Sequence, residues 1–278
     1  MERFATMRVW NVDLGLAVHV EAPNNRYMVI DMGSSKSVHP MRRLMLRHVD
    51  YMVITHPHQD HFSDIESIFK NPKVLWHTNA YTKEELLAQS DSPLMKKYIA
   101  LCEGYGDEIQ PQNNPANGIL FRGMEVKTFW ATKCDKSTIN NASAVVVARL
   151  GTAKVVICGD NQKESLEELM LDPEFVVAIQ NAQVLVAPHH GRETGYVEEF
   201  VKIVNPRLTI ISDTIKSESS AVDKYSEHSE GYIVVNSKTG EKEQRECLTT
   251  RKDGNIEVRF GYNDSDPEPI LWVNYMVD

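Results

Sequence analysis

Short apolar runs separated by polar turns follow one another along most of the chain. Each run is rich in β-branched and aromatic residues and is bounded by Asn, Pro or Gly, which is the pattern of β-strands. We expect a first series of strands at residues 8–20, 27–30, 51–54, 74–76 and 123–130, and a second series at 144–148, 155–158, 184–187 and 208–211. Apolar residues recurring every three or four positions predict helices at 82–89, 163–171 and 196–204.

The C-terminal part of the chain is also rich in predicted strands, which we place at residues 231–235, 256–260 and 270–273. Two series of strands with helices between them predict an α/β fold. In this fold two mixed β-sheets pack face to face and helices flank them, as a four-layer αββα sandwich. We expect a single domain over residues 1–278, with its core at 8–215 and a β-rich extension, 216–278, that completes the sandwich.

Charge and cysteine content narrow the class of protein. The net charge of −9 argues against broad electrostatic attachment to nucleic acid or to an anionic membrane surface. The four cysteines lie far apart without a CxxC pair, which favours free thiols in a reducing compartment. No segment approaches the roughly 18 apolar residues of a membrane span. We therefore expect a cytoplasmic protein without membrane contact; its oligomeric state is left open.

One polar segment directly after the predicted strand 51–54 carries four candidate metal ligands, in the order Thr55-His56-Pro57-His58-Gln59-Asp60-His61. In an extended turn the first two histidines point to the same side, and the last two ligands face a neighbouring point in space. Imidazole and carboxylate groups suit zinc and are accepted by manganese or iron. The alternative is a polar helix cap with exposed histidines, but crowded histidines without a cation repel one another when protonated.

Two more candidate ligand groups follow apolar strands of the second series, where loops commonly converge on a site. Gly159-Asp160 delivers one carboxylate, and Pro188-His189-His190-Gly191 delivers two imidazoles. By itself Asp160 is equally well explained as a helix cap. Together with the histidine-rich segment, both groups become candidate ligands of the same site.

In order and spacing these motifs, together with Asp31, resemble the metallo-β-lactamase superfamily over most of residues 8–215. The details are similar to its ComEC-like branch, which includes domains of competence DNA-uptake proteins and secreted phosphorylcholine esterases. The segments that carry this second resemblance are Asn11-Val12-Asp13-Leu14-Gly15, Asn140-Asn141-Ala142-Ser143, Gly159-Asp160 and Pro188-His189-His190-Gly191.

The resemblance implies two divalent metal ions, with zinc as the first choice and manganese as the alternative. Asp31 is implied to support the ligand segment through hydrogen bonds rather than by coordination. Of the paired histidines, His189 is favoured as the ligand over His190. The implied ligands are His56 and His58 for the first metal, Asp60, His61 and His189 for the second, and Asp160 as the bridge between them.

Two features depart from the superfamily pattern. Asn140 and Asn141 stand where a third histidine is expected for the first metal, which predicts a weaker first site and a neutral group that orients or contacts substrate. Arg192 stands where the branch often has serine, and it is either a bidentate clamp for a substrate phosphate or the partner of a neighbouring acid. His228, in a polar segment of the C-terminal half, is a further candidate that is equally compatible with plain exposure.

The predicted function is a metal-dependent hydrolase, foremost a phosphodiesterase or nuclease that cleaves DNA by attack of metal-bound hydroxide on phosphorus. In this scheme Asp160 holds the metal spacing and Asp60 orients the hydroxide. The negative net charge motivates hydrolysis of a small phosphodiester or ester as an alternative. The missing third histidine motivates another, a non-catalytic metal-binding regulatory module. Residues 90–117 either shape the substrate pocket or form a surface insertion without a role in the site.

Overall fold

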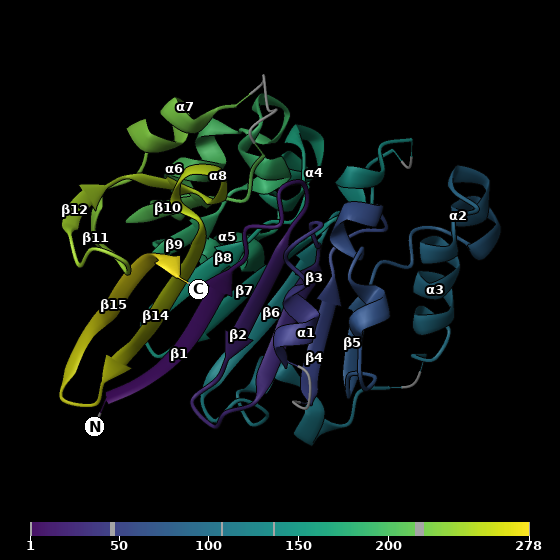
Figure 1. The fold of residues 1–278 in the computed structure, drawn as a ribbon, viewed down its shortest axis with the longest axis horizontal. Helices are drawn as coiled ribbons and strands as arrows, with labels where there is room; N and C mark the ends of the chain where they lie inside the picture. Colours follow the sequence, from purple (N-terminus) through teal and green to yellow (C-terminus); the bar gives the residue numbers. More distant parts are fainter. Residues whose placement is uncertain (1, 45–47, 107, 136, 215–219, 278) are drawn as a thin grey trace.

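The computed structural model describes residues 2–44, 48–106, 108–135, 137–214 and 220–277, and two β-sheets dominate this part of the chain (Figure 1). The first sheet has the order β12 (Lys242–Arg245), β11 (Tyr232–Asn236), β15 (Asp266–Val277), β14 (Asn255–Asn263), β1 (Glu2–Val9), β2 (Ala17–Glu21), β3 (Tyr27–Met32), β4 (Val49–Ile54) and β5 (Val74–His77). The second has the order β13 (Cys247–Thr249), β10 (Leu208–Ile211), β9 (Val184–Val186), β8 (Ala153–Ile157), β7 (Ala144–Leu150) and β6 (Met124–Trp130). Both sheets contain parallel and antiparallel pairs.

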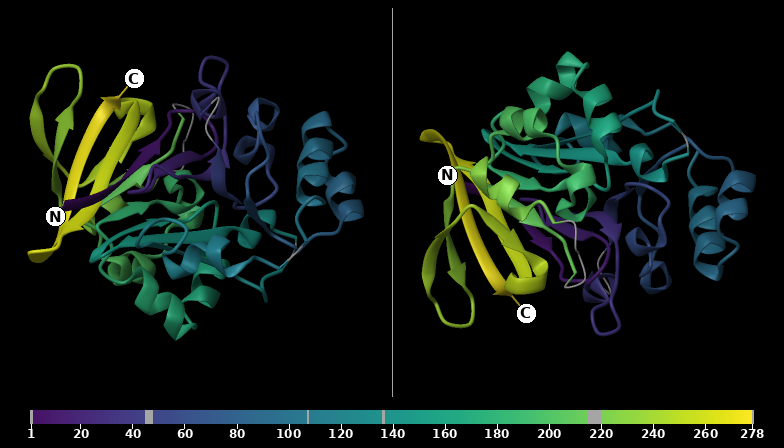
Figure 2. Two further views of the ribbon diagram at one scale, coloured as in Figure 1. Left: turned by 90° about the horizontal axis from the view of Figure 1, so that it is seen from below. Right: turned by 90° about the horizontal axis from the view of Figure 1, so that it is seen from above.

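Helices cover the outer faces of the stacked sheets (Figure 2). The first sheet is covered near β3, β4 and β5 by α1 (Pro40–Leu44), α2 (Lys83–Gln89) and α3 (Pro93–Cys102). The second sheet is covered by α4 (Lys163–Leu169), α5 (Pro173–Ile179), α6 (Glu198–Val204) and α7 (Val222–Glu227), and α8 (Thr250–Asp253) follows β13. This arrangement confirms the predicted αββα sandwich.

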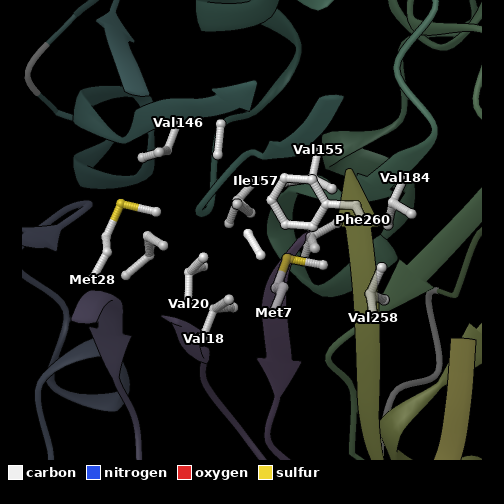
Figure 3. Close-up of a cluster of buried hydrophobic side chains, with 14 of the residues drawn as sticks. Met7, Val18, Val20, Met28, Val146, Val155, Ile157, Val184, Val258 and Phe260 are labelled. Atoms are coloured by element: carbon white, nitrogen blue, oxygen red, sulfur yellow. The ribbon is translucent and has the colours of Figure 1, made fainter. Parts of the chain in front are cut away.

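Between the sheets lies a core of aliphatic side chains, methionines and Phe260 (Figure 3). Met7 from β1 and Ile157 from β8 belong to it, and so do Val258 and Phe260 from β14. Strand β14 pairs antiparallel with β1, and β13 pairs parallel with β10. The C-terminal strands therefore extend both sheets, while residues 215–219, where we placed the start of the extension, lie outside the described residues.

The predicted strand at residues 8–20 is wrong, because the structure divides it into β1 and β2 with a loop at 10–16. Alternating apolar residues in this loop imitate a strand. Gly15 has φ +108°, and a Cβ atom there would lie 2.2 Å from the carbonyl oxygen of Asp60. The loop therefore packs directly against the segment of candidate metal ligands, and only glycine leaves room for this contact.

The segment 90–117 contains helix α3, which the sequence analysis did not identify. Ser92 caps this helix by accepting a hydrogen bond from the Met95 amide, and Pro93 occupies its first turn. The Gln59 side chain donates to the hydroxyls of Ser90 and Ser92. The start of α3 is thus tied to the ligand segment.

Two further sequence expectations concern cysteines and membrane spans. All four cysteines are free, and Cys158 and Cys247 are buried. Within the described ranges, no helix has the length and apolar character needed to cross a membrane.

If the C-terminal strands are part of one cooperative core, Phe260→Ala should destabilise the whole protein. Phe260 is fully buried between the sheets, and such truncations cost about 3–5 kcal/mol. The measurement is the free energy of unfolding in denaturant, with Leu171→Ala as control because Leu171 is 80% exposed. A separate transition for the C-terminal part, with the remaining core unaffected, would contradict this expectation.

Candidate metal centre

The candidate ligands lie at strand ends contributed by both sheets. In the first sheet, β4 ends at Ile54 and leads through Thr55 into the ligand segment, whose last residues form the 3₁₀ helix Gln59–His61. In the second sheet, β8 leads to Asp160, and β9 leads to the 3₁₀ helix Pro188–Gly191. The backbone amide of Ala144, the first residue of β7, donates to the Thr55 carbonyl at 3.0 Å. The site is thus built where the two sheets meet.

Two groups of donor atoms form there, and within each group the atoms lie within 4.8 Å of one another. Asp160 faces both. Its Oδ2 lies 3.7 Å from Nε2 of His56, and its Oδ1 lies 3.2 Å from Nε2 of His61 and 3.3 Å from Nε2 of His190. The first group consists of His56, His58 and Asp160, and the second of Asp60, His61 and His190.

The remaining distances complete the two groups. Nε2 of His56 and Nδ1 of His58 are 3.0 Å apart. Oδ2 of Asp60 lies 3.9 Å from Nε2 of His61 and 3.8 Å from Nε2 of His190. Nitrogen and oxygen donors therefore form two groups on either side of Asp160, a donor set that suits a pair of divalent ions.

Buried polar atoms without a hydrogen-bond partner test whether these residues fit a metal. Within the described residues, Nε2 of His61, Nε2 of His190 and Oδ1 of Asp160 are buried and have no such partner. Leaving buried polar atoms unpaired is costly, so native structures rarely do it without a compensating group. A cation bound among them would satisfy all three atoms, and the donor set therefore fits a divalent metal.

Hydrogen bonds behind the ligands fix which ring nitrogen faces the site. Nδ1 of His61 donates to Oδ2 of Asp31 at 2.6 Å, and Nδ1 of His190 donates to the Ser212 carbonyl at 2.9 Å. Because a carbonyl oxygen can only accept, Nδ1 of His190 carries a proton, and Nε2 is the nitrogen left for a metal. Both imidazoles thus turn Nε2, the atom at which a bound metal would replace a proton, toward Asp160.

Asp31 also anchors the start of the ligand segment. It accepts 2.7 Å hydrogen bonds from both the amide and the hydroxyl of Thr55. The Thr55 hydroxyl lies 3.2 Å from Nδ1 of His56 and can accept a hydrogen bond from it, which turns Nε2 of His56 toward the site. Asp31 therefore holds Thr55 and His61 by hydrogen bonds, and Thr55 is a neighbour of the candidate ligands that the sequence did not single out.

The electrostatic environment favours an ionised Asp160. Against the effect of burial, Asp160 raises the pKa of His190, and Asp160 and Asp31 raise the pKa of His61 well above its usual value. Burial opposes ionisation of Asp160, but His190 and His61 hold its pKa well below the usual range. Burial and the neighbouring His61 lower the pKa of His56 well below its usual value. Asp160 is therefore a carboxylate and His56 a neutral imidazole, which are the protonation states that bind metals.

Of the paired histidines, His190 lies with Asp60 and His61, whereas the sequence favoured His189 as the ligand. Both residues have positive φ, +49° for His189 and +56° for His190, and this backbone sends their side chains to different surroundings. Such conformations are strained for residues other than glycine and persist where the surroundings enforce them.

His189 instead links two polar side chains. Its Nδ1 lies 2.6 Å from the Thr194 hydroxyl, and its Nε2 lies 3.1 Å from Nδ2 of Asn140. Burial, and then the charges of His190 and Arg192, lower the pKa of His189 to about 4 despite Asp160. A neutral His189 accepts from Asn140 and donates to Thr194, so it fixes the orientation of the Asn140 amide.

The two asparagines differ in their surroundings. Oδ1 of Asn140 is buried without a partner in the described part of the chain, and Asn140 lines a hollow of about 390 Å³ together with His58. The Asn141 side chain accepts from the Gln162 amide at 3.3 Å and lies 3.4 Å from Glu164. Asn140 thus faces the ligand segment, while Asn141 holds the start of α4.

The last two predicted residues differ in their closeness to the site. Arg192 is half-buried, lies near enough to His189 to influence its pKa, and has no ion-pair partner among the described residues. His228 is placed elsewhere, because its ring contacts the Tyr196 hydroxyl at 3.2 Å and the Lys224 carbonyl at 3.0 Å. These contacts hold His228 beside helix α7 and beside Tyr196, which precedes α6.

Ser212 is a site residue that the sequence analysis missed. Its carbonyl orients His190, and its hydroxyl donates to the Gly15 carbonyl at 2.8 Å, which joins β10 of one sheet to the loop after β1 of the other. Ser212 is a polar residue directly after the apolar strand β10, and a polar residue after an apolar strand is also the pattern by which the sequence indicated Asp160. The same pattern could have identified Ser212.

Comparisons with known proteins agree with this geometry. The sequence model of the metallo-beta-lactamase superfamily matches residues 10–212. The chain is 25% identical over 169 residues to ComE operon protein 3 of Bacillus subtilis (strain 168), and the match covers 60% of this chain but only 20% of that protein. The chain therefore spans about a fifth of this relative's length.

A solved structure supports the fold. Igni18, described as a novel metallo hydrolase from the archaeon Ignicoccus hospitalis, matches with a TM-score of 0.53 and 15% sequence identity. The match covers 93% of this chain and all of Igni18. At this level of identity, the likeness concerns the fold.

The geometry predicts that His190→Ala and His189→Ala differ in bound metal. His190→Ala removes a donor atom of the second group and should lower the metal content after dialysis by about one equivalent relative to the unaltered protein. His189→Ala should retain the full content, because His189 contacts Asn140 and Thr194. The measurement is metal analysis by mass spectrometry. Loss of metal in His189→Ala alone would contradict the assignment.

Proposed function

The chain belongs to the metallo-beta-lactamase superfamily, and on that premise we propose that it is a phosphodiesterase that uses two divalent metal ions. The observation that carries the proposal is the buried carboxylate of Asp160, which faces donor groups from both halves of the site. A carboxylate shared in this way holds two cations at a fixed separation, which is the arrangement used for in-line displacement at phosphorus.

The proposed ligands are the two groups described above. His56 and His58 would hold the first metal, Asp60, His61 and His190 would hold the second, and Asp160 faces both groups. Zinc suits this mixture of imidazole and carboxylate donors best, and manganese is the alternative. The first metal has fewer protein ligands, so we expect it to bind more weakly than the second.

Bound divalent ions supply Lewis-acid activation of water and neutralise charge that develops on phosphoryl oxygens. The two carboxylates have different exposure, since the Asp60 side chain is 28% exposed and that of Asp160 is 5% exposed. We assign to Asp60 the orientation of the attacking water, because its oxygens reach solvent and can accept a hydrogen bond from it. Asp160 stays buried and fixes the metal spacing.

Two neighbouring side chains are suited to hold the substrate phosphate. Arg192 has no acidic partner in the described residues, so its guanidinium is available for a bidentate contact with phosphate oxygens. The Asn140 amide lines the hollow beside His58 and is held in place by His189. These groups bind a phosphodiester without adding a titrating charge at the point of attack.

DNA is the first substrate we propose, because the sequence motifs resemble the competence branch of the superfamily. The net charge of −9 favours a second candidate, a small phosphodiester such as a nucleotide ester. A polyanion binds through many phosphate contacts and needs a basic surface, whereas a small ester needs contacts at the site alone.

The proposed function predicts metal-dependent release of nucleotides from linear DNA, or of p-nitrophenolate from bis(p-nitrophenyl) phosphate. Asp160→Asn should lower the rate at least about a hundredfold, since even residues behind metal ligands typically contribute 10–100-fold. Chelation should abolish the activity, and the exposed Asp223→Asn serves as the matched control.

The outcomes separate the candidates. Activity on both substrates supports a nuclease, and activity on the model diester alone supports a small-molecule phosphodiesterase. If protein with verified bound metal hydrolyses neither, the phosphodiesterase proposal fails and a non-catalytic metal-binding module takes its place.

A further inference from the structure

Two tryptophans lie where the sandwich is open at its edge. Trp76 is in β5, the last strand of the first sheet, and Trp130 ends β6, the last strand of the second. Their ring centroids are 5.4 Å apart, with the planes inclined at 58°. Along β6, Trp130 shares its face with Met124 and Val126, which belong to the core between the sheets. Trp130 nevertheless remains 41% exposed.

Strand register connects this tryptophan edge to the metal centre. Trp130 pairs with Ala144, whose amide donates to the carbonyl of Thr55, the residue before His56. Trp76 pairs with Val53 in the strand that leads into the same ligand segment. Both tryptophans therefore lie next to the strand positions from which the ligands emerge.

A hollow of about 140 Å³ lies against Trp130. Its lining includes Tyr81, the exposed Asn79 and Asn141. The next residue in the chain, Asn140, lines the larger hollow beside His58. Asn141 and Asn140 are consecutive residues with Cα atoms about 3.8 Å apart, so the linings of the two hollows meet at one peptide bond.

We propose that Trp130 stacks on a nucleobase of the substrate while the attached phosphodiester lies in the hollow beside His58. This inference rests on the proposed phosphodiesterase function and adds the side chain that binds the base of a nucleotide ester. Every base offers a flat π-face, and an exposed indole binds it by stacking without reading its sequence. The Asn79 amide offers both a donor and an acceptor to the edge of the base.

Stacking also resolves the difficulty raised by the net charge. A protein at −9 cannot rely on a broad basic surface to hold a nucleotide chain. An aromatic contact beside the metal centre gives affinity for the base that depends little on charge. Trp130, Tyr81 and the exposed Asp135 are also the kinds of side chain that bind a quaternary ammonium group. The Asn79 amide favours a base, because its donor and acceptor match the polar edge of a base.

The test compares two esters with the same leaving group, thymidine 5′-(p-nitrophenyl phosphate) and methyl p-nitrophenyl phosphate. We expect the protein to prefer the thymidine ester. Trp130→Ala should raise KM for the thymidine ester roughly tenfold, consistent with the loss of one stacked base. KM for the methyl ester should change by less than about twofold. Trp130→Phe should retain most of the preference. Trp272→Ala is the matched control, because Trp272 is 42% exposed on β15.

A binding measurement keeps the inference separate from the proposed function. Thymidine 5′-monophosphate should quench tryptophan fluorescence in the unaltered protein and in Trp272→Ala, and the quench should be largely lost in Trp130→Phe. If quenching occurs without hydrolysis, the function fails and the base site stands. Absence of quenching would overturn the inference. So would an equal loss of activity on both esters in a Trp130→Ala protein whose melting temperature is unchanged. Preference for a choline ester over the thymidine ester would overturn it as well.

Discussion

The structure depends on a buried carboxylate that both sheets help to surround. Asp160 emerges from β8 of the second sheet, yet its oxygens face His56 and His61 from the segment after β4 of the first. Burying such a charge is strongly unfavourable unless neighbouring charges and dipoles compensate it. His190 and His61 supply part of that compensation and keep the pKa of Asp160 low. The contacts that pack the two sheets together therefore also assemble the candidate metal site.

The residues around Asp160 show how hydrogen bonds hold the side chains that surround this buried charge. Asp31 accepts hydrogen bonds from His61 and Thr55 and so fixes the ligand segment in the first sheet. Ser212 orients His190 and reaches across to Gly15, which itself packs on the Asp60 carbonyl. His56, His61 and His190 are each oriented by a hydrogen bond from the far side of the ring, with Thr55, Asp31 and Ser212 as partners. Preorganisation of this kind is what a metal-dependent reaction requires.

Much of this arrangement could be predicted from sequence, because strand ends carry readable signals. The histidine-rich segment and Asp160 follow apolar runs directly, and the two sheets bring those ends to one edge. That His190 rather than His189 lies beside Asp60 and His61 could not be predicted, since it depends on two successive positive φ values that leave no trace in residue spacing. The loop at residues 10–16 was hidden because its apolar residues alternate as in a strand.

The central claim is that two metals share Asp160 and that His190, not His189, binds one of them. Anomalous diffraction from crystals loaded with zinc measures this directly. The account predicts two peaks about 3.5–4 Å apart, with Asp160 between them and Nε2 of His190 at about 2.0–2.1 Å from one. A single peak away from Asp160, or a peak coordinated by His189, would contradict it.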